Sequence, residues 1–151
     1  MTDLDDLDRA LLRAARSLGS LNAGQLGEKV GLSQPAAWRR LRRLREIGVI
    51  TGQHVRVDAE KAGFGVTVLV GVKLAARGTA VMGDFERAVQ AIPEVLVVQH
   101  VLGLFDYRLR IVARDLEDFE RILRRRVMTL PGVGAVESNI VLSEERRPLP
   151  I

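Results

Sequence analysis

The segment from Gly31 to Gly52, GLSQPAAWRRLRRLREIGVITG, constrains the fold most because it combines a turn, a basic helix and a stop. At about 100° per residue, Ala37, Leu41 and Leu44 fall on one face of the helix, which can pack on a small core. The same helix carries five arginines, namely Arg39, Arg40, Arg42, Arg43 and Arg45. Three of them, Arg39, Arg42 and Arg43, point away from the apolar face, so the other side presents a row of guanidinium groups.

The flanks of this helix complete a two-helix motif. Ser33 is placed to cap the first turn, and Gly48 is placed to end the helix. Upstream, Asn22–Val30 is expected to form a short helix that joins through the turn residue Gly31. Two short helices with a glycine turn, the second one basic, indicate a helix-turn-helix that binds duplex DNA, although a merely solvated basic face is the alternative. Downstream, Val49–Val57 is expected to be extended, as a small wing or a crossing strand.

Positive charge is concentrated around this motif. The 151 residues carry a formal net charge of +4. Residues 9–58 hold ten Lys/Arg against three Asp/Glu, whereas residues 1–8 hold four Asp. Residues 59–151 are nearly balanced, with thirteen basic and twelve acidic side chains. The positive field favours an anionic partner such as DNA, and the balanced second half needs another role.

Composition argues against several other functions. The chain has no cysteine, which rules out disulfides and thiolate metal sites. The only histidines are His54 and His100, and no Ser, Cys or paired His completes a nucleophile or metal set with them. We therefore expect no enzyme, no catalytic residue, no metal and no cofactor. The acidic N-terminus and the lack of a run of 18 apolar residues predict a cytoplasmic protein without a membrane partner.

The second half has the periodicity of alternating strands and helices. Its expected elements are the strand Val66–Leu74, the helix Asp84–Ile92, the strand Val95–Leu102, the hairpin turn Gly103–Asp106, the strand Tyr107–Ala113, a helix lined by Leu116, Phe119, Ile122, Leu123, Val127 and Leu130, and the strand Ala135–Leu142. This order is βαββαβ, the ferredoxin-like arrangement. Helices then cover one sheet face, and the apolar residues of the other face predict a partner sheet.

These patterns predict an α+β chain with two domains. We expect residues 1–52 to form a winged helix-turn-helix DNA-binding domain, residues 53–63 a linker or connecting strand, and residues 64–151 a ferredoxin-like domain.

Several motifs, in this order and spacing, resemble the Lrp/AsnC family of transcription regulators. They are LDDLDRALLRAAR (Leu4–Arg16), LGEKVGLS (Leu26–Ser33), RRLRRLREIGVITG (Arg39–Gly52), GLFDYRL (Gly103–Leu109), LPGVGAVES (Leu130–Ser138) and the tail Leu149–Ile151. One departure is Gly27, where the family usually has Ala. The resemblance implies a regulator whose second domain, residues 64–151, serves effector binding and oligomerisation. In that family this domain dimerises by pairing sheets, and the dimers assemble into tetramers or octamers.

The resemblance also implies that an amino acid or similar effector binds between dimers, near the hairpin. Carried over by position, the effector-binding residues are Gly103, Leu104, Phe105, Asp106, Tyr107 and Ser138. Leu104 stands where the family usually has a polar residue, which shifts specificity towards an apolar effector or marks a lost site. Asp106 is suited to pair with an ammonium, and amides near Gly103 with a carboxylate. The alternative is structural, with Gly103 as a turn glycine and Asp106 as a hairpin cap.

The predicted DNA contacts lie on the basic helix and its first turn. They are Ser33, Gln34, Pro35, Trp38, Arg39, Arg40, Arg42 and Arg43. Gln34 can read adenine, Arg39 or Arg43 can read guanine or hold phosphate, and the other two arginines hold phosphates. Trp38 contacts a thymine methyl or a sugar, or else lies at the rim of the core. Two alternatives to a sequence-specific regulator are a nucleoid-type architectural protein and an enzyme similar to siroheme decarboxylases.

Overall fold

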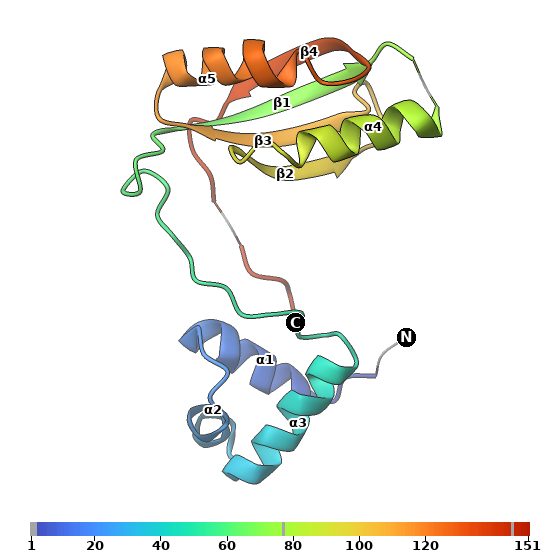
Figure 1. Ribbon diagram of the computed structural model, residues 1–151. Coiled ribbons are helices and arrows are strands. Elements are labelled where there is room, and N and C mark those ends of the chain that lie inside the picture. Colours follow the sequence, from blue (N-terminus) through green and yellow to red (C-terminus); the bar gives the residue numbers. More distant parts are fainter. Residues whose placement is uncertain (1–2, 77, 146) are drawn as a thin grey trace. The chain divides into compact units, whose positions relative to one another are not determined.

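The computed structural model describes residues 3–76, 78–145 and 147–151. They form two compact units (Figure 1). The N-terminal unit extends to Arg56 and includes residues 147–151, and the second unit extends from Val57 to Glu145. Within these described ranges, no helix is long and apolar enough to cross a membrane.

The N-terminal unit is built from three helices, α1 (Asp6–Leu18), α2 (Ala23–Val30) and α3 (Gln34–Glu46). Asp5 caps α1, because its side chain accepts the Asp8 N–H at 2.7 Å while the Asp8 carboxylate accepts the Asp5 N–H at 3.2 Å. The small core of the unit consists of Leu11, Ala14, Ala23, Leu26, Ala37 and Leu41. The apolar face predicted for α3 is confirmed, since Ala37, Leu41 and Leu44 are all buried.

The segment after α3 is not a paired strand. Residues 51–57 make no strand pairing with the described part of the chain, and the Val55 side chain is exposed. The expectation of a crossing strand at Val49–Val57 is therefore wrong for this structure. Its apolar residues have no strand to pair with in the N-terminal unit, because helices are the only regular elements among the described residues of that unit.

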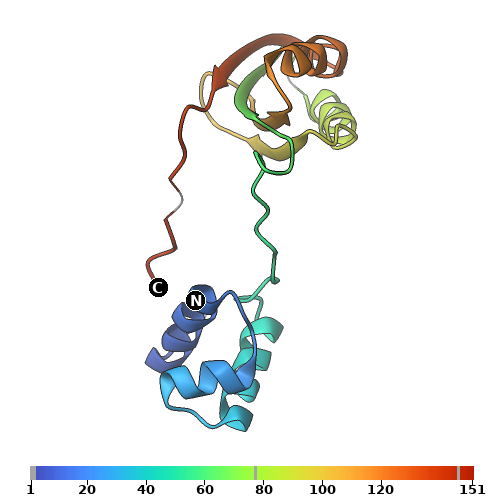
Figure 2. The ribbon, with the colours of Figure 1, turned by 90° about the vertical axis from the view of Figure 1, so that its left-hand side faces the viewer.

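The second unit has the predicted βαββαβ order. Its elements are β1 (Val66–Leu74), α4 (Thr79–Val89), β2 (Val95–His100), β3 (Tyr107–Ala113), α5 (Leu116–Ile122) continued by the π-helical turn η1 (Leu123–Val127), and β4 (Val133–Ile140). The sheet is antiparallel in the order β2-β3-β1-β4. Both helices lie on one face of it (Figure 2). The α+β fold class is thus confirmed.

Strand alternation places the core between this sheet and its helices. Val68, Val70 and Val72 of β1 are fully buried, whereas Leu69 between them is 36% exposed. Phe85 of α4 and Tyr107 of β3 complete the interior, with ring centroids 4.6 Å apart. Among the described residues of this unit, no helix lies on the opposite face of the sheet (Figure 2).

The helix boundaries differ from those predicted. The first helix of this unit begins at Thr79 rather than Asp84, because Val81 and Met82 extend its apolar face and Gly83 is tolerated inside it. In the second helix, Leu116 is 56% exposed and does not line the core. It occupies the first turn, ahead of the buried residues Phe119 and Ile122.

Candidate nucleic-acid interface and effector pocket

The turn between α2 and α3 is tight and depends on two glycines. Gly31 ends α2 with a left-handed backbone, φ +73°, and the Leu32 N–H then donates to the Gly27 carbonyl at 2.8 Å. A Cβ atom at position 27 would lie 2.6 Å from the Leu32 carbonyl oxygen. Glycine therefore allows α2 and the turn to approach closely, which explains the departure at this position. The Ser33 hydroxyl accepts the Ala36 N–H at 3.4 Å and caps α3.

One side of α3 is free to meet a partner. Gln34, Trp38 and Arg42 follow one another at i,i+4 spacing along one flank of the helix, and they and Arg39 are exposed. The Trp38 side chain is 51% exposed, so it lies on the surface rather than in the core rim. The Arg42 guanidinium carbon lies 5.5 Å from the Trp38 ring centroid, and Arg42 Nε donates to Glu46 at 2.7 Å.

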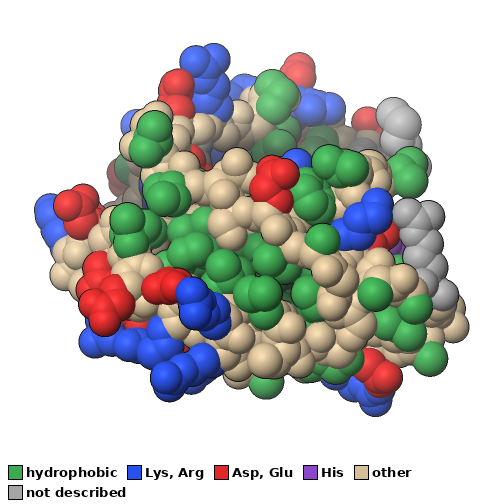
Figure 3. All heavy atoms as spheres, turned by 90° about the horizontal axis from the view of Figure 1, so that it is seen from above, with side chains coloured by type: hydrophobic (Ala, Val, Ile, Leu, Met, Phe, Trp, Pro, Cys, Tyr) green, Lys and Arg blue, Asp and Glu red, His purple; other side chains and the backbone are tan. Residues whose placement is uncertain are grey.

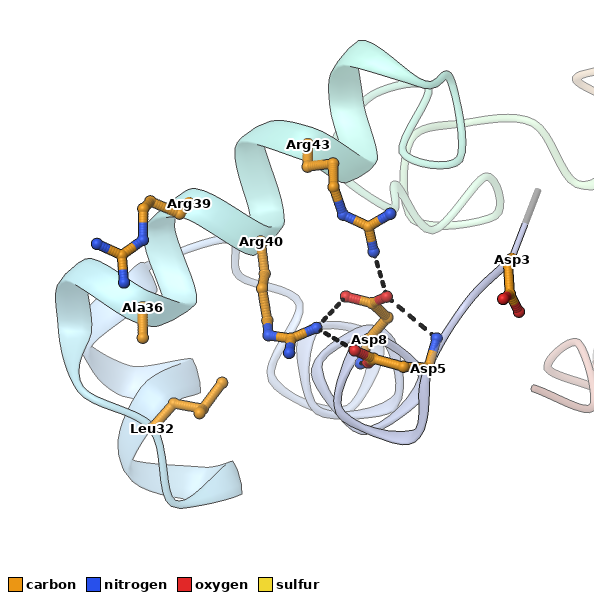
Figure 4. A pocket seen from close by; sticks show the side chains of 8 residues that line it. All are labelled: Asp3, Asp5, Asp8, Leu32, Ala36, Arg39, Arg40 and Arg43. Atoms are coloured by element: carbon orange, nitrogen blue, oxygen red, sulfur yellow. Dashed lines mark hydrogen bonds and ion pairs between the residues drawn. The ribbon is translucent and has the colours of Figure 1, made fainter.

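The other side of α3 faces α1 and is held by carboxylates (Figure 4). Arg40 Nη1 donates to Asp5 at 2.6 Å and to Asp8 at 2.9 Å, and Arg43 Nη2 donates to Asp8. The Asp8 side chain is completely buried. The Asp8 N–H and the Arg40 guanidinium together lower the pKa of Asp5, and hydrogen bonds to Asp5 and Asp8 raise the pKa of Arg40.

Sequence reasoning missed this ion-pair network. It treated Arg40 and Arg43 as members of one basic surface and assigned no role to Asp5 and Asp8. The available signal was the i,i+3 spacing of the two aspartates, which places them on one face of α1 at its N-terminus. The spacing does not show that α1 packs against α3, because the ion pairs between these helices join residues 32 to 35 positions apart.

The hairpin loop of the second unit is bound tightly to β1. The Asp106 carboxylate accepts the Leu74 N–H at 2.9 Å, and the Asp106 N–H donates to the Val72 carbonyl at 2.9 Å. The Phe105 ring packs against Gly71, where an added Cβ would lie only 2.7 Å from the ring. These contacts fit the structural reading of Asp106 and also fix where its carboxylate lies.

A cavity of about 250 Å³ opens beside this loop. It is lined by Leu74, Met82, His100, Val101, Leu102, Gly103 and Asp106. Two of the six predicted effector residues, Gly103 and Asp106, therefore line one cavity. The other four do not line it: Leu104 is 72% exposed, Phe105 packs on Gly71, Tyr107 is buried, and Ser138 lies on β4, beyond β1.

Tyr107 gives this unit a pH-dependent stability that can be measured directly. Its hydroxyl donates to Glu86 at 2.7 Å, and burial, with the Glu86 hydrogen bond, raises its pKa from 10.0 to about 12. Folding therefore favours the neutral phenol, and its stabilisation is complete below pH 10.0 and lost as pH rises towards about 12. Because the chain has one tyrosine, tyrosinate absorbance reports this group alone. A folded protein that ionises with an ordinary pKa would contradict the prediction.

The remaining candidate chemistry is limited. Within the described residues, no group of three or more His, Asp or Glu side chains is arranged to hold a metal ion. The His100 ring stacks on Tyr107 with ring centroids 5.0 Å apart.

Comparisons with known proteins agree with this arrangement. Residues 4–51 match the model for winged helix-turn-helix DNA-binding domains, and residues 67–149 match the Lrp/AsnC ligand binding domain. The Bkd operon transcriptional regulator of Pseudomonas aeruginosa is 34% identical over 94% of this chain and 93% of its own length. Among solved structures, a Neisseria meningitidis transcriptional regulator in complex with L-methionine matches with TM-score 0.90 and 26% identity, covering 99% of this chain and 96% of its own. A Mycobacterium tuberculosis feast or famine regulatory protein, also complexed with L-methionine, matches with TM-score 0.85 and 27% identity, covering 98% of this chain and 100% of its own.

Proposed function

The chain belongs to the Lrp/AsnC family of DNA-binding transcriptional regulators, and from that premise we propose how its two units divide the work. Residues 1–52 bind operator DNA, residues 53–63 connect the units, and residues 64–151 bind an effector and join copies of the chain. The protein acts on DNA in the cytoplasm and has no catalytic step.

The observation that carries the DNA-binding assignment is the exposed face of α3. In a helix-turn-helix the second helix enters the major groove, and its N-terminal residues reach base edges. Here Ser33, Gln34 and Pro35 occupy that end, while Trp38, Arg39 and Arg42 continue the exposed face. Gln34 is suited to adenine and Arg39 to guanine or phosphate, since their side chains can make two hydrogen bonds to those groups. Arg40 and Arg43, by contrast, donate to Asp5 and Asp8 at the start of α1.

The effector proposal rests on the cavity beside the hairpin loop. A carboxylate offers about four lone-pair positions, so Asp106 can hold the Leu74 N–H together with an effector ammonium. The amides near Gly103 are suited to the effector carboxylate, and Met82 and Leu102 give the remaining wall an apolar surface. An apolar amino acid fits this lining. The two methionine complexes of related regulators support the same class of ligand.

Assembly is proposed from the sheet face that no helix covers. Leu69, Arg110 and Val97 lie in one row across that face, because Arg110 pairs with both of the others in register. Leu69 is 36% and Val97 39% exposed, and Leu96 beside them is 58% exposed. Apolar side chains that are exposed on a sheet in this way are buried when two sheets pack face to face, and the Arg110 guanidinium between them is already paired with Glu144. A second copy of the chain is the proposed partner, and sedimentation of the purified protein measures the mass of the assembly.

The assignment is tested by selecting genomic DNA with the purified protein and then measuring anisotropy on a selected duplex and on its scrambled sequence. Selective binding that shifts when amino acids are added would support both halves of the proposal. Equal affinity for the two duplexes would favour an architectural DNA-binding protein instead, and no binding at low salt would exclude the DNA-binding role.

The effector site is tested by Asp106→Asn. Asparagine keeps an oxygen for the Leu74 N–H but removes the charge that an ammonium would meet, so we expect at least about tenfold weaker effector binding with the fold retained. Calorimetric titration with the amino acid that shifts DNA binding measures the change. Asp84→Asn is the matched control, because Asp84 pairs with Arg87 on the surface of α4 and does not line the cavity. Equal affinities for both variants would remove Asp106 from the site.

A further inference from the structure

Two of the five arginines on α3 are paired with carboxylates at the start of α1. Arg40 bridges Asp5 and Asp8, and Arg43 reaches Asp8 from one turn further along the helix. The side chain of Asp8 has no exposed surface, while those of Arg40 and Arg43 are 28% and 45% exposed. Figure 4 shows both guanidinium groups turned towards the carboxylates, whereas Arg39 points away from them.

The Arg42 ion pair is of a different kind. Arg42 and Glu46 are 63% and 58% exposed and lie one turn apart on the same helix. Exposed pairs of this kind are weak, so a DNA phosphate can replace Glu46 at little cost. The pairs with Asp8 are much harder to replace, because opening them would leave a buried carboxylate without its cations.

Resting on the proposed DNA-binding role of α3, we propose that Asp5 and Asp8 determine specificity by keeping Arg40 and Arg43 off the DNA backbone. A carboxylate and a phosphate present similar anionic oxygens to a guanidinium, so the aspartates occupy the donors that a phosphate would use. Binding to non-operator DNA depends almost entirely on such phosphate contacts. Withholding two arginines therefore weakens non-operator binding, while base contacts from the opposite side of α3 are unaffected.

The first test compares two pairs of aspartates in the same segment. Asp5→Asn with Asp8→Asn removes both carboxylates of the network, whereas Asp3→Asn with Asp6→Asn removes equal charge from residues that have no partner among the described side chains. On a non-operator duplex, the dependence of log affinity on log salt should be steeper for the Asp5/Asp8 variant than for the Asp3/Asp6 variant. The difference in slope should be about two for each bound copy of the chain. The ratio of operator to non-operator affinity should also fall for the Asp5/Asp8 variant. Equal salt slopes for the two folded variants would overturn the proposal.

A second comparison keeps the proposal testable if the aspartate variant does not fold. The chain with Asp5→Asn, Asp8→Asn, Arg40→Gln and Arg43→Gln has a neutral network and the net charge of the parent, so its salt slope should match the parent within error. The chain with Arg39→Gln and Arg42→Gln should lose a slope of about two. If the first set flattens the slope as much as the second, Arg40 and Arg43 do contact phosphates and the inference is wrong. If the second set leaves the slope unchanged, the proposed DNA-binding face itself is wrong.

Discussion

A chain carrying Arg40→Ala and Arg43→Ala should lose about 3 kcal/mol of unfolding free energy. The two substitutions leave the fully buried carboxylate of Asp8 without either of its cations, and Asp5 places a second negative charge beside it. Removing the partners of a buried charge is among the most destabilising changes known in proteins. Because both arginines are partly exposed, we place the loss near the lower end of that range. Denaturant unfolding followed by Trp38 fluorescence measures it, since Trp38 is the only tryptophan.

Two further variants show whether the buried charge is the cause. Adding Asp8→Asn to the double variant should restore much of the lost free energy, because an amide is far cheaper to bury than a carboxylate. The matched control is Arg39→Ala with Arg42→Ala, which removes the same side chains from the exposed face of α3 and should cost at most about 1 kcal/mol. Similar losses for both arginine pairs, or no recovery with Asp8→Asn, would contradict an essential role of the network in stability.

The sequence predicts those elements whose apolar residues recur at a regular local spacing. The positions of Ala37, Leu41 and Leu44 at helical spacing predicted the buried face of α3, and the alternation from Val66 to Leu74 predicted the inner face of β1. The cap of α3 could be predicted as well, because the Ser33 hydroxyl accepts a backbone N–H from the first turn of the same helix. Each of these features depends on neighbours within a few residues, which is the range over which a sequence pattern can be read.

Pairings between distant segments were out of reach for the same reason. From the sequence, the arginines of α3 have the same expected role as DNA contacts. In the structure, α1 packs beside two of them, Arg40 and Arg43, and pairs them with Asp5 and Asp8. The backbone N–H of the hairpin residue Asp106 donates to the Val72 carbonyl of β1, and its carboxylate accepts the Leu74 N–H. A local turn pattern does not predict these two contacts. Ser138 was grouped with the hairpin by resemblance, but the strand order separates them within one chain. Tertiary packing therefore decides which predicted residues meet.

Gly27→Ala should destabilise the helix-turn-helix by about 1–3 kcal/mol, although alanine is the better helix former. Helix propensity alone favours the alanine by about 0.8–1 kcal/mol. The new methyl group, however, would lie 2.6 Å from the Leu32 carbonyl oxygen and 3.5 Å from the Ala37 side chain. The carbonyl has little room to move, because the Leu32 N–H donates back to the Gly27 carbonyl and the next residue, Ser33, caps α3. Steric conflict therefore outweighs propensity, and α3 must shift relative to α2.

Gly83→Ala provides the control, since it makes the same substitution inside α4, where no atom beyond the neighbouring residues and the backbone of that helix lies within 4 Å of the new methyl group. It should stabilise the second unit by up to about 1 kcal/mol, because only the helix propensity term applies. Thermal unfolding of both variants, followed by Trp38 fluorescence for the first unit and circular dichroism for the whole chain, shows whether each substitution raises or lowers stability. The Gly27 variant should also bind operator DNA more weakly, since the turn sets the angle at which α3 is presented. A Gly27→Ala chain that is as stable as the parent would mean that the turn yields easily, and the close approach at this position would then not constrain α3.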